Sequence, residues 1–272
     1  MRLPLTPLTP RVHARRRDRD AVQFGVGSAH SRYVDRLTAE EIDALVSLGG
    51  LTVAQWSGVL PTLDDGTRWA HLTPLLMGAV LAQEVPCVAG RVTVDGPGPV
   101  AEAITSVLTA MGCSVLPAAV ARVVRHRLDL VVVVGSEAVP ARRLDAWQRI
   151  GSRVLPVAVT ADRVDLGPLL GAAEGPCAEC VDLARCDLDP AWPALAAQLV
   201  LPPSEDGDVA TVPELVAGAA GLAGLVLRGL SSGQELPPGI SLSLATPATT
   251  IGHHLWRRHP LCACGRLGLT GS

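Results

Sequence analysis

The stretch RVTVDGPGPVA, residues 91–101, decides the fold of the larger part of the chain. Its apolar alternation over Val92–Val94 predicts a short strand, and the glycines that follow predict a tight turn. Gly96, Gly98 and Ala101 then fit the spacing G-x-G-x-x-A at the point where a helix begins. A strand, a glycine turn and a helix in this order open a Rossmann-like βαβ unit.

Downstream of this turn, apolar strands alternate with amphipathic helices. We expect helices over Val100–Met111 and Ala138–Ile150, and strands over Ser114–Ala118, Leu128–Val134 and Val154–Val159. The middle strand is nearly continuously apolar, as strands buried on both faces are. The pattern predicts an α/β domain of the doubly wound, Rossmann-like class, with a mostly parallel sheet covered by helices on both faces.

The same glycine turn is poorly equipped to bind a nucleotide. Pro97 and Pro99 remove two backbone N–H groups from the loop that would cradle phosphate. About 20 residues on, where a carboxylate would bind the ribose, residues 113–120 carry no acid. We therefore interpret Gly96, Gly98 and Ala101 as a degenerate cofactor-binding loop, with a structural turn favoured over an ATP site.

The C-terminal part of the domain adds a helix of small residues and a late pair of strands. Leu215–Leu230 predicts a long helix in which Gly218, Gly221 and Gly224 recur every third residue. Such glycines weaken a helix but let another backbone approach closely. We expect this helix to be buried, within the domain or in a homodimer, and we expect the strand pair between Ile240 and Trp256.

Two cysteine pairs predict a metal site. Thiolates two or three residues apart on a tight turn can share one tetrahedral zinc, and a complete set of four makes the site structural. The four predicted ligands are Cys177, Cys180, Cys262 and Cys264. Ordinary buried thiols or a redox pair are the alternatives, and Cys186 or His259 lies close enough in sequence to replace one ligand. Cys87 and Cys113 are predicted to be core residues.

The composition excludes several functions. The chain has 272 residues, is 48% hydrophobic and carries a net charge of -3, so it predicts a folded globular protein without the basic footprint of nucleic-acid binding. Its 23 basic residues are all arginine. Without lysine there is neither a Walker-type phosphate lysine nor a Schiff base.

The chain also lacks the signals of export. Residues 1–10 contain three prolines and no apolar run ahead of the arginines, which is the wrong order for a secretory signal. The longest apolar run, Leu215–Leu227, is shorter than the roughly 20 residues of a membrane span. We expect a cytoplasmic protein that does not associate with a membrane, in which metal binding explains paired cysteines better than disulfides do.

Residues 1–86 predict a separate small module. Val12, Val22, Phe24 and Val26 are spaced like one face of a strand or hairpin, and the arginines among them predict solvated positions. Three helices are expected to follow, the first capped by Thr38 and the others over Thr52–Val59 and Leu72–Glu84. We interpret this module as a winged-helix-like α+β unit, followed by the Rossmann-like domain of residues 87–272.

The order of these features resembles the ThiF-type (ubiquitin-activating-like) adenylyltransferase family. The resemblance covers about residues 91–265 and depends most on the half-site Gly175-Pro-Cys-Ala-Glu-Cys180 and the ending His259-Pro-Leu-Cys-Ala-Cys-Gly265. Within that family the chain is most similar to the branch of azole-peptide (TOMM, bacteriocin) cyclodehydratase components. That branch carries an N-terminal winged-helix-like peptide clamp, which implies such a role for residues 1–86.

The resemblance implies a role in ribosomal-peptide modification. Members of that branch bind the leader of a precursor peptide and present it to a separate ATP-using cyclodehydratase that forms azolines. Active adenylating relatives carry an aspartate after the third strand, where this chain offers Gly135-Ser136. We therefore expect a non-catalytic scaffold with structural zinc and no catalytic residues. The alternative is an active ATP-dependent adenylyltransferase that activates a peptide or protein C-terminus.

Overall fold

The computed structural model describes most of the chain, and its described residues fall into two compact units. One unit lies within Pro7–Pro86 and the other within Cys87–Ser272. The described residues are 11–27, 31–63, 69–81, 88, 90–124, 127–172, 174–199, 211–247 and 250–265.

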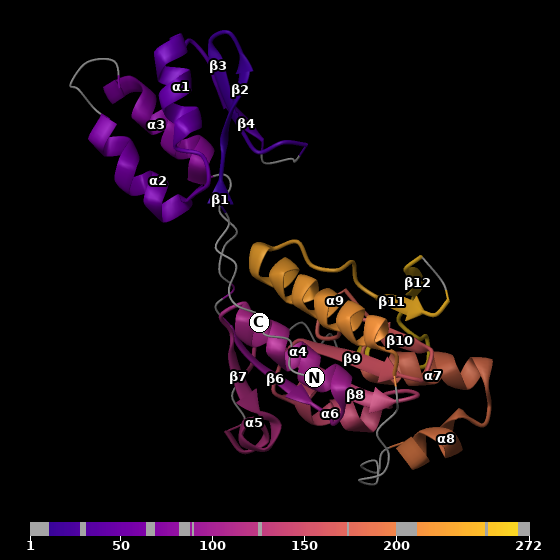
Figure 1. The fold of residues 1–272 in the computed structure, drawn as a ribbon. Helices are drawn as coiled ribbons and strands as arrows, with labels where there is room; N and C mark the ends of the chain where they lie inside the picture. Colours follow the sequence, from indigo (N-terminus) through magenta and orange to yellow (C-terminus); the bar gives the residue numbers. More distant parts are fainter. Residues whose placement is uncertain are drawn as a thin grey trace. The chain divides into compact units, whose positions relative to one another are not determined.

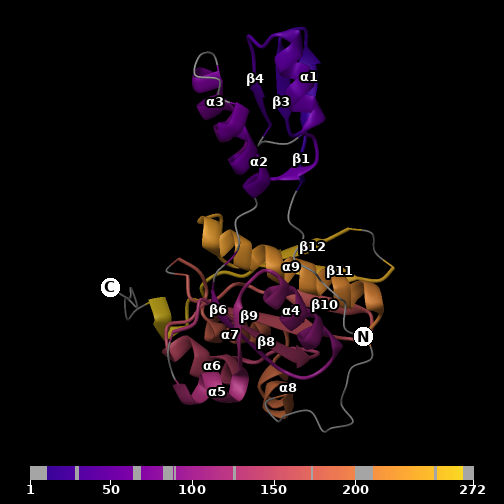
Figure 2. The ribbon, with the colours of Figure 1, turned by 60° about the vertical axis from the view of Figure 1, so that its left-hand side comes forward.

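The smaller unit contains two short sheets. Strands β2 (Ala14–Asp18), β3 (Ala21–Phe24) and β4 (Arg32–Val34) form a three-stranded antiparallel sheet in that order. A two-residue strand β1 (Arg11–Val12) pairs with β5 (Leu51–Thr52). Figure 2 shows helix α1 (Ala39–Ser47) lying against the three-stranded sheet, which buries one face of that sheet and leaves the other to solvent.

Three helices build the rest of this unit. Helix α1 is followed by α2 (Val53–Val59), the 3-10 turn η1 (Leu60–Leu63) and α3 (Trp69–Leu81). Thr38 and Thr52 both cap their helices in capping boxes, the first with Glu41 as predicted and the second with Gln55. The predicted end of the third helix, residues 82–84, lies outside the described residues.

A tight apolar core holds this unit together. Phe24 and Trp56 are fully buried and meet edge to face, with their ring centroids 5.6 Å apart. The indole Nε1 of Trp56 donates to the carbonyl of Val12 over 3.1 Å, so the core also ties β1 to α2. The predicted shared face is confirmed for Val12, Val22 and Phe24, which are buried, but it is wrong for Val26, which lies beyond the end of β3 and is 71% exposed.

The larger unit is built on one seven-stranded sheet (Figure 1), in the order β12-β11-β10-β9-β8-β6-β7. Four neighbouring strands are parallel, as the sequence predicts. They are β6 (Arg91–Asp95), β7 (Ser114–Pro117), β8 (Leu130–Ser136) and β9 (Val154–Val159). Strand β7 lies on one side of β6, and the next strand along the chain, β8, lies on the other side. The direction in which strands are added to the sheet therefore reverses between β6 and β8.

Three antiparallel strands extend the sheet beyond β9. They are β10 (Arg163–Leu166), β11 (Ile240–Ala245) and β12 (Gly252–Leu255). The late strand pair was predicted, but β10 was not, because it is only four residues long and follows β9 after a short turn. Its pairing with both β9 and β11 connects the late strands to the parallel part of the sheet.

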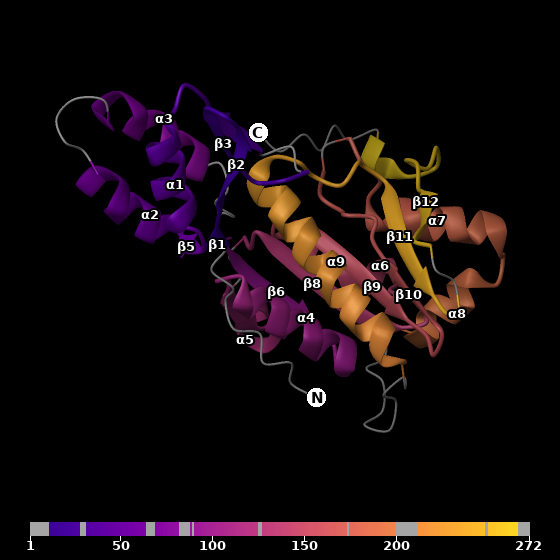
Figure 3. The same ribbon diagram turned by 45° about the horizontal axis from the view of Figure 1, so that its top comes forward.

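Helices cover both faces of this sheet. Figure 3 shows α9 (Pro213–Ser232) running beside α4 (Pro99–Ala110) over one face, where both pack on the largest apolar cluster. Helices α5 (Ala118–Val124), α6 (Ala141–Arg149) and α7 (Ala178–Leu188) pack on the other face. A short helix α8 (Trp192–Leu199) follows α7, and the 3-10 turn η2 (Ala263–Gly265) ends the described chain. The doubly wound prediction is confirmed for this part of the chain.

Helix α9 is the one described helix with the length and apolar character of a membrane span. Seven of its residues are buried against the sheet and α4, which is how a core helix packs. A Cβ on Gly224 would lie 3.0 Å from Val107 of α4, and one on Gly218 would lie 2.8 Å from Leu244 of β11. The predicted close approach is therefore made within this chain, whereas Gly221 faces open space.

Candidate metal centre and glycine loop

The two cysteine pairs lie at turns where the backbone N–H groups point toward sulfur. Cys177 is the N-cap of α7, and Cys180 lies in the first turn of that helix. Cys262 and Cys264 follow β12, the first in a turn just before η2 and the second within η2. The pair from the middle of the chain and the pair near its end meet because β12 runs back along β11 toward α7.

The four sulfur atoms form one compact group. All four lie within 4.8 Å of one another. The separations are 3.7 Å between Cys177 and Cys180, 3.5 Å between Cys177 and Cys262, and 3.4 Å between Cys180 and Cys264. Four sulfurs at about 2.3 Å from a tetrahedral zinc lie about 3.8 Å apart. The described residues therefore contain a four-thiol group that can hold a metal ion.

The thiols differ in their acidity. Burial raises the pKa of Cys177, Cys262 and Cys264 to about 11. Burial also opposes ionisation of Cys180, but backbone N–H groups of His259 and Cys177 donate toward its sulfur and lower its pKa. Cys180 therefore ionises most readily of the four thiols, and a metal that binds here must displace the protons that the thiols still carry.

The two residues considered as substitute ligands are engaged elsewhere or lie apart. His259 Nε2 lies 2.8 Å from Oδ2 of Asp187, and its Nδ1 accepts a hydrogen bond from the N–H of Leu261 over 3.2 Å. Cys186 is a free thiol outside the four-cysteine group. Cys113 is buried, as predicted, while Cys87 lies outside the described residues.

The glycine loop has the conformation that its residues predict. Gly96 and Gly98 have positive φ angles of 151° and 93°, and Gly98 is the N-cap of α4. A Cβ on Gly96 would lie 2.4 Å from the carbonyl oxygen of Val134 in β8, so only glycine fits. Ala101 is buried where α4 packs on the sheet. Close packing thus requires the glycine at position 96, and the backbone conformation favours the glycine at position 98.

Charged side chains occupy the point where the strand order reverses, which is where doubly wound folds bind ligands. Asp95 at the end of β6 is buried and accepts hydrogen bonds from Arg122 over 2.6 Å and from Trp147 Nε1 over 3.0 Å. Arg143 donates to the carbonyl of Val134 over 3.0 Å, and burial lowers its pKa. The sequence did not predict this cluster, although Asp95 directly precedes Gly96.

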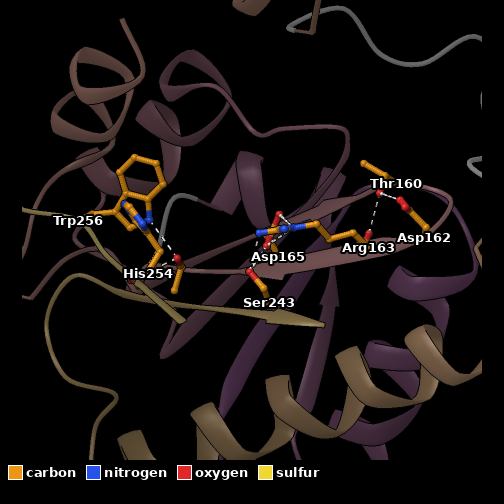
Figure 4. Close-up of polar contacts among 8 residues, drawn as sticks. Thr160, Asp162, Arg163, Asp165, Ser243, His254 and Trp256 are labelled. Carbon is orange, nitrogen blue, oxygen red and sulfur yellow. Dashed lines mark hydrogen bonds and ion pairs between the residues drawn. The ribbon is translucent and has the colours of Figure 1, made fainter. Parts of the chain in front are cut away.

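A second polar network lies on the antiparallel strands (Figure 4). Arg163 Nε donates to both carboxylate oxygens of Asp165 over 2.9 and 2.8 Å, and its Nη2 donates to Ser243 over 2.9 Å. Ser243 in turn donates to Asp165. Farther along, Trp256 Nε1 donates to Ser241 over 3.0 Å. These groups line a cavity of about 290 Å³ between the sheet and α6 and α7, which went unpredicted because β10 was missed.

Comparison with known proteins yields structural likeness alone. No protein-family model matches the chain, and no curated protein matches it. Among solved structures, a heterocyclase in complex with substrate and cofactor matches 97% of this chain and 40% of its own chain, with a TM-score of 0.63 and 16% identity. The heterocyclase TruD matches 93% of this chain and 42% of its own, with a TM-score of 0.60 and 16% identity. The chain shares its fold with part of a heterocyclase.

A structure of E. coli MccB with MccA-N7isoASN is a weaker match. It covers 95% of this chain and 99% of its own, with a TM-score of 0.50 and 14% identity. The chain therefore spans about two-fifths of the two heterocyclases but nearly the whole length of MccB. At these identities the likeness shows the fold alone.

Proposed function

We propose that this chain is a non-catalytic scaffold that binds a ribosomal precursor peptide and presents it to an ATP-using, azoline-forming partner enzyme. The observation that carries the proposal is the match of 97% of this chain to only 40% of a substrate-bound heterocyclase. We assign the ATP-dependent chemistry to the partner because the glycine loop has prolines at positions 97 and 99, where a phosphate-binding loop needs N–H groups. We include a cytoplasmic location in the proposal, since the described cysteines are free thiols.

Strand β4 is the proposed peptide site. It lies at the edge of its sheet, where it pairs with β3 alone among the described residues, and helix α3 packs beside it. An edge strand offers unpaired N–H and C=O groups to an extended peptide. The other edge strand, β2, carries several arginines, which disfavour strand addition there. The smaller unit would thus act as a winged-helix-like clamp.

Zinc is the proposed occupant of the four-cysteine group. Thiolate sulfurs favour zinc among common divalent metals, and a complete set of four leaves no open position for substrate. Bound zinc would hold the chain after β12 against the start of α7 and add folding stability to the antiparallel strands. Metal analysis tests this part: about one zinc per chain is expected, and protein purified without chelator that lacks zinc would contradict it.

The glycine loop supports the non-catalytic role. Two of its residues are prolines without N–H groups, and Glu102 in the first turn of α4 is exposed and would repel phosphate. The alternative, an active adenylyltransferase, is favoured by the strand–turn–helix context of Gly96 and Gly98. ATP–pyrophosphate exchange with the precursor peptide separates the two functions. Exchange that is lost on Gly98→Leu would contradict the scaffold.

Peptide binding is tested with the full chain and the leader segments of candidate precursor peptides, such as the products of any short reading frames found near its gene. Fluorescence anisotropy should show ATP-independent binding of the labelled leader. N-methylation of alternate peptide residues should abolish binding in one register and leave it intact in the other, because only alternate N–H groups pair with an edge strand. A leader that binds equally well in both registers, or fails to bind, would overturn the proposed site.

A further inference from the structure

The solvent face of the three-stranded sheet carries a cross-strand row of polar side chains. Arg15, Gln23 and Tyr33 lie opposite one another on β2, β3 and β4. The opposite face is the core face, where Val22 and Val34 are buried. From this row we infer that the chain selects an acidic peptide, one that carries a carboxylate opposite Tyr33. The inference rests on the proposed function, and it names the chemistry of the peptide.

The side chain of Arg17, on β2, extends across the sheet to β4. The register between β2 and β3 shifts between Arg16 and Asp18, which leaves Arg17 as the extra residue of a bulge. Its Nη1 donates to Oε1 of Gln23 on β3 over 2.7 Å, and its guanidinium lies 4.6 Å from the ring centroid of Tyr33 on β4. The positive charge of a side chain on β2, at one edge of the sheet, therefore lies next to β4, at the other edge.

The position of this guanidinium suits a strand added beside β4. Neighbouring strands lie about 4.8 Å apart, so a residue opposite Tyr33 on an added strand would have its side chain next to the guanidinium of Arg17. The guanidinium has five N–H donors, and the amide of Gln23 takes one of them. The others can donate to a carboxylate, which forms stronger hydrogen bonds than a neutral acceptor does.

Charge within the sheet favours an acidic ligand. Arg16, on the core face of β2, pairs with Asp43 of α1 over 2.6 Å. Arg17 has an amide and an aromatic ring as partners, and neither Arg15 nor Arg17 forms an ion pair among the described residues. Among the described residues, the arginine that faces helix α1 therefore has an acidic partner, whereas the two arginines of the solvent face have none.

A peptide fits this surface better than a nucleic acid does. Nucleic-acid binding gains most of its affinity from many phosphate contacts, which the net charge of -3 does not favour. An open strand edge supplies main-chain pairing to a peptide and has no such partner in a phosphate backbone. A carboxylate at alternate positions of an extended chain would meet the arginine face with every second residue.

The test uses the full chain and two fluorescein-labelled dodecapeptides, one of alternating threonine and glutamate and one of alternating threonine and glutamine. Anisotropy should show that the glutamate peptide binds about tenfold more tightly at low salt, with the difference reduced at high salt. Arg17→Gln should remove most of this preference. Arg16→Gln, on the same strand but the opposite face, is the matched control and should preserve it.

The remaining outcomes separate this inference from the proposed function. Equal binding of the two peptides, or a preference that survives Arg17→Gln, would overturn the acidic preference even when the precursor leader binds. A single-stranded oligothymidine that binds in a manner dependent on Arg17, while neither peptide binds, would overturn it in favour of nucleic acid. A glutamate preference that depends on Arg17 supports the inference even when the encoded precursor is not a ligand.

Discussion

In the parallel half of the seven-stranded sheet, β8 buries six of its seven residues, whereas every residue of β12 in the antiparallel half is exposed. The parallel strands lie between α4 and α9 on one face and α5 and α6 on the other. The antiparallel strands have α9 on one face and a polar network on the other. One half is stabilised by burial on both sides, and the other needs polar pairs and the cysteine group.

The largest effect is expected from the parallel half. Trp147 of α6 is almost fully buried and also donates to Asp95, so Trp147→Ala should lower the free energy of unfolding by about 4 kcal/mol. Chemical denaturation measures this loss. Leu195→Ala on the exposed side of α8 is the control and should change stability little. If Trp147→Ala is as stable as Leu195→Ala, burial on both faces is not what stabilises the parallel half.

Loss of the metal group should act mainly on the antiparallel half. Cys262→Ser removes one of the four proposed zinc ligands and should cost about 3 kcal/mol, a value typical of losing a cross-link that closes a long loop. Hydrogen exchange should accelerate in β11 and β12 and change little in β8. Cys186→Ser, a thiol outside the group, should retain full zinc. Equal acceleration in β8 would show that the two halves unfold as one.

Removing the metal from the wild-type protein should reveal a pH dependence. Burial raises the pKa of Cys177, Cys262 and Cys264 from 9.0 to about 11 in the metal-free fold. Between these pH values the folded state binds more protons than the unfolded state, so stability falls as the pH rises. Thermal melts of chelator-treated protein from pH 8 to 11 should show this fall. The zinc-loaded protein, whose ligands are already thiolates, should not.

A smaller effect is expected where α7 meets β12. The guanidinium of Arg185 lies 4.7 Å from the ring centroid of Trp192 and 5.5 Å from that of Trp256, with Asp182 3.6 Å away. Burial raises the pKa of Asp182, so its charge depends on this neighbour. Arg185→Met should cost about 1–2 kcal/mol. The double variant Arg185→Met with Asp182→Asn should recover part of that loss. If the losses of stability in the two single variants simply add in the double variant, the two side chains are not coupled.

The sequence predicts the parallel half much better than the antiparallel half, for a physical reason. Strands buried on both faces, such as residues 130–134, are continuous apolar runs that no polar pattern interrupts. Strand β10 contains Arg163 and Asp165, which look like loop residues until their partner Ser243, some 80 positions later in the chain, is known. A pairing at that sequence distance leaves no local periodicity to detect.

The candidate site also contains some residues that the sequence predicts and others that only the fold brings together. The four cysteines were identified from spacing alone, because two short motifs with turn residues carry the metal chemistry locally. The cluster of Asp95, Arg122 and Trp147 joins three separate elements, and only the fold brings them together. Arg17 likewise reaches β4 through a bulge whose position depends on cross-strand register. Side-chain pairs between distant elements are what the sequence could not supply.

The smallest loss of stability is expected when a single hydroxyl is removed from the antiparallel half. Ser243→Ala removes a hydroxyl that accepts from Arg163 and donates to Asp165 on the partly exposed face of β11. Both partners can turn to water and remain bonded to each other, so the loss should be only about 0.5 kcal/mol. Val132→Ala, in fully buried β8, should cost about 2 kcal/mol, because the cavity it leaves cannot be filled by solvent. Urea denaturation of both variants measures the difference. If Ser243→Ala costs as much as Val132→Ala, the polar network is itself part of a cooperative core, and the antiparallel half does not depend mainly on the cysteine group.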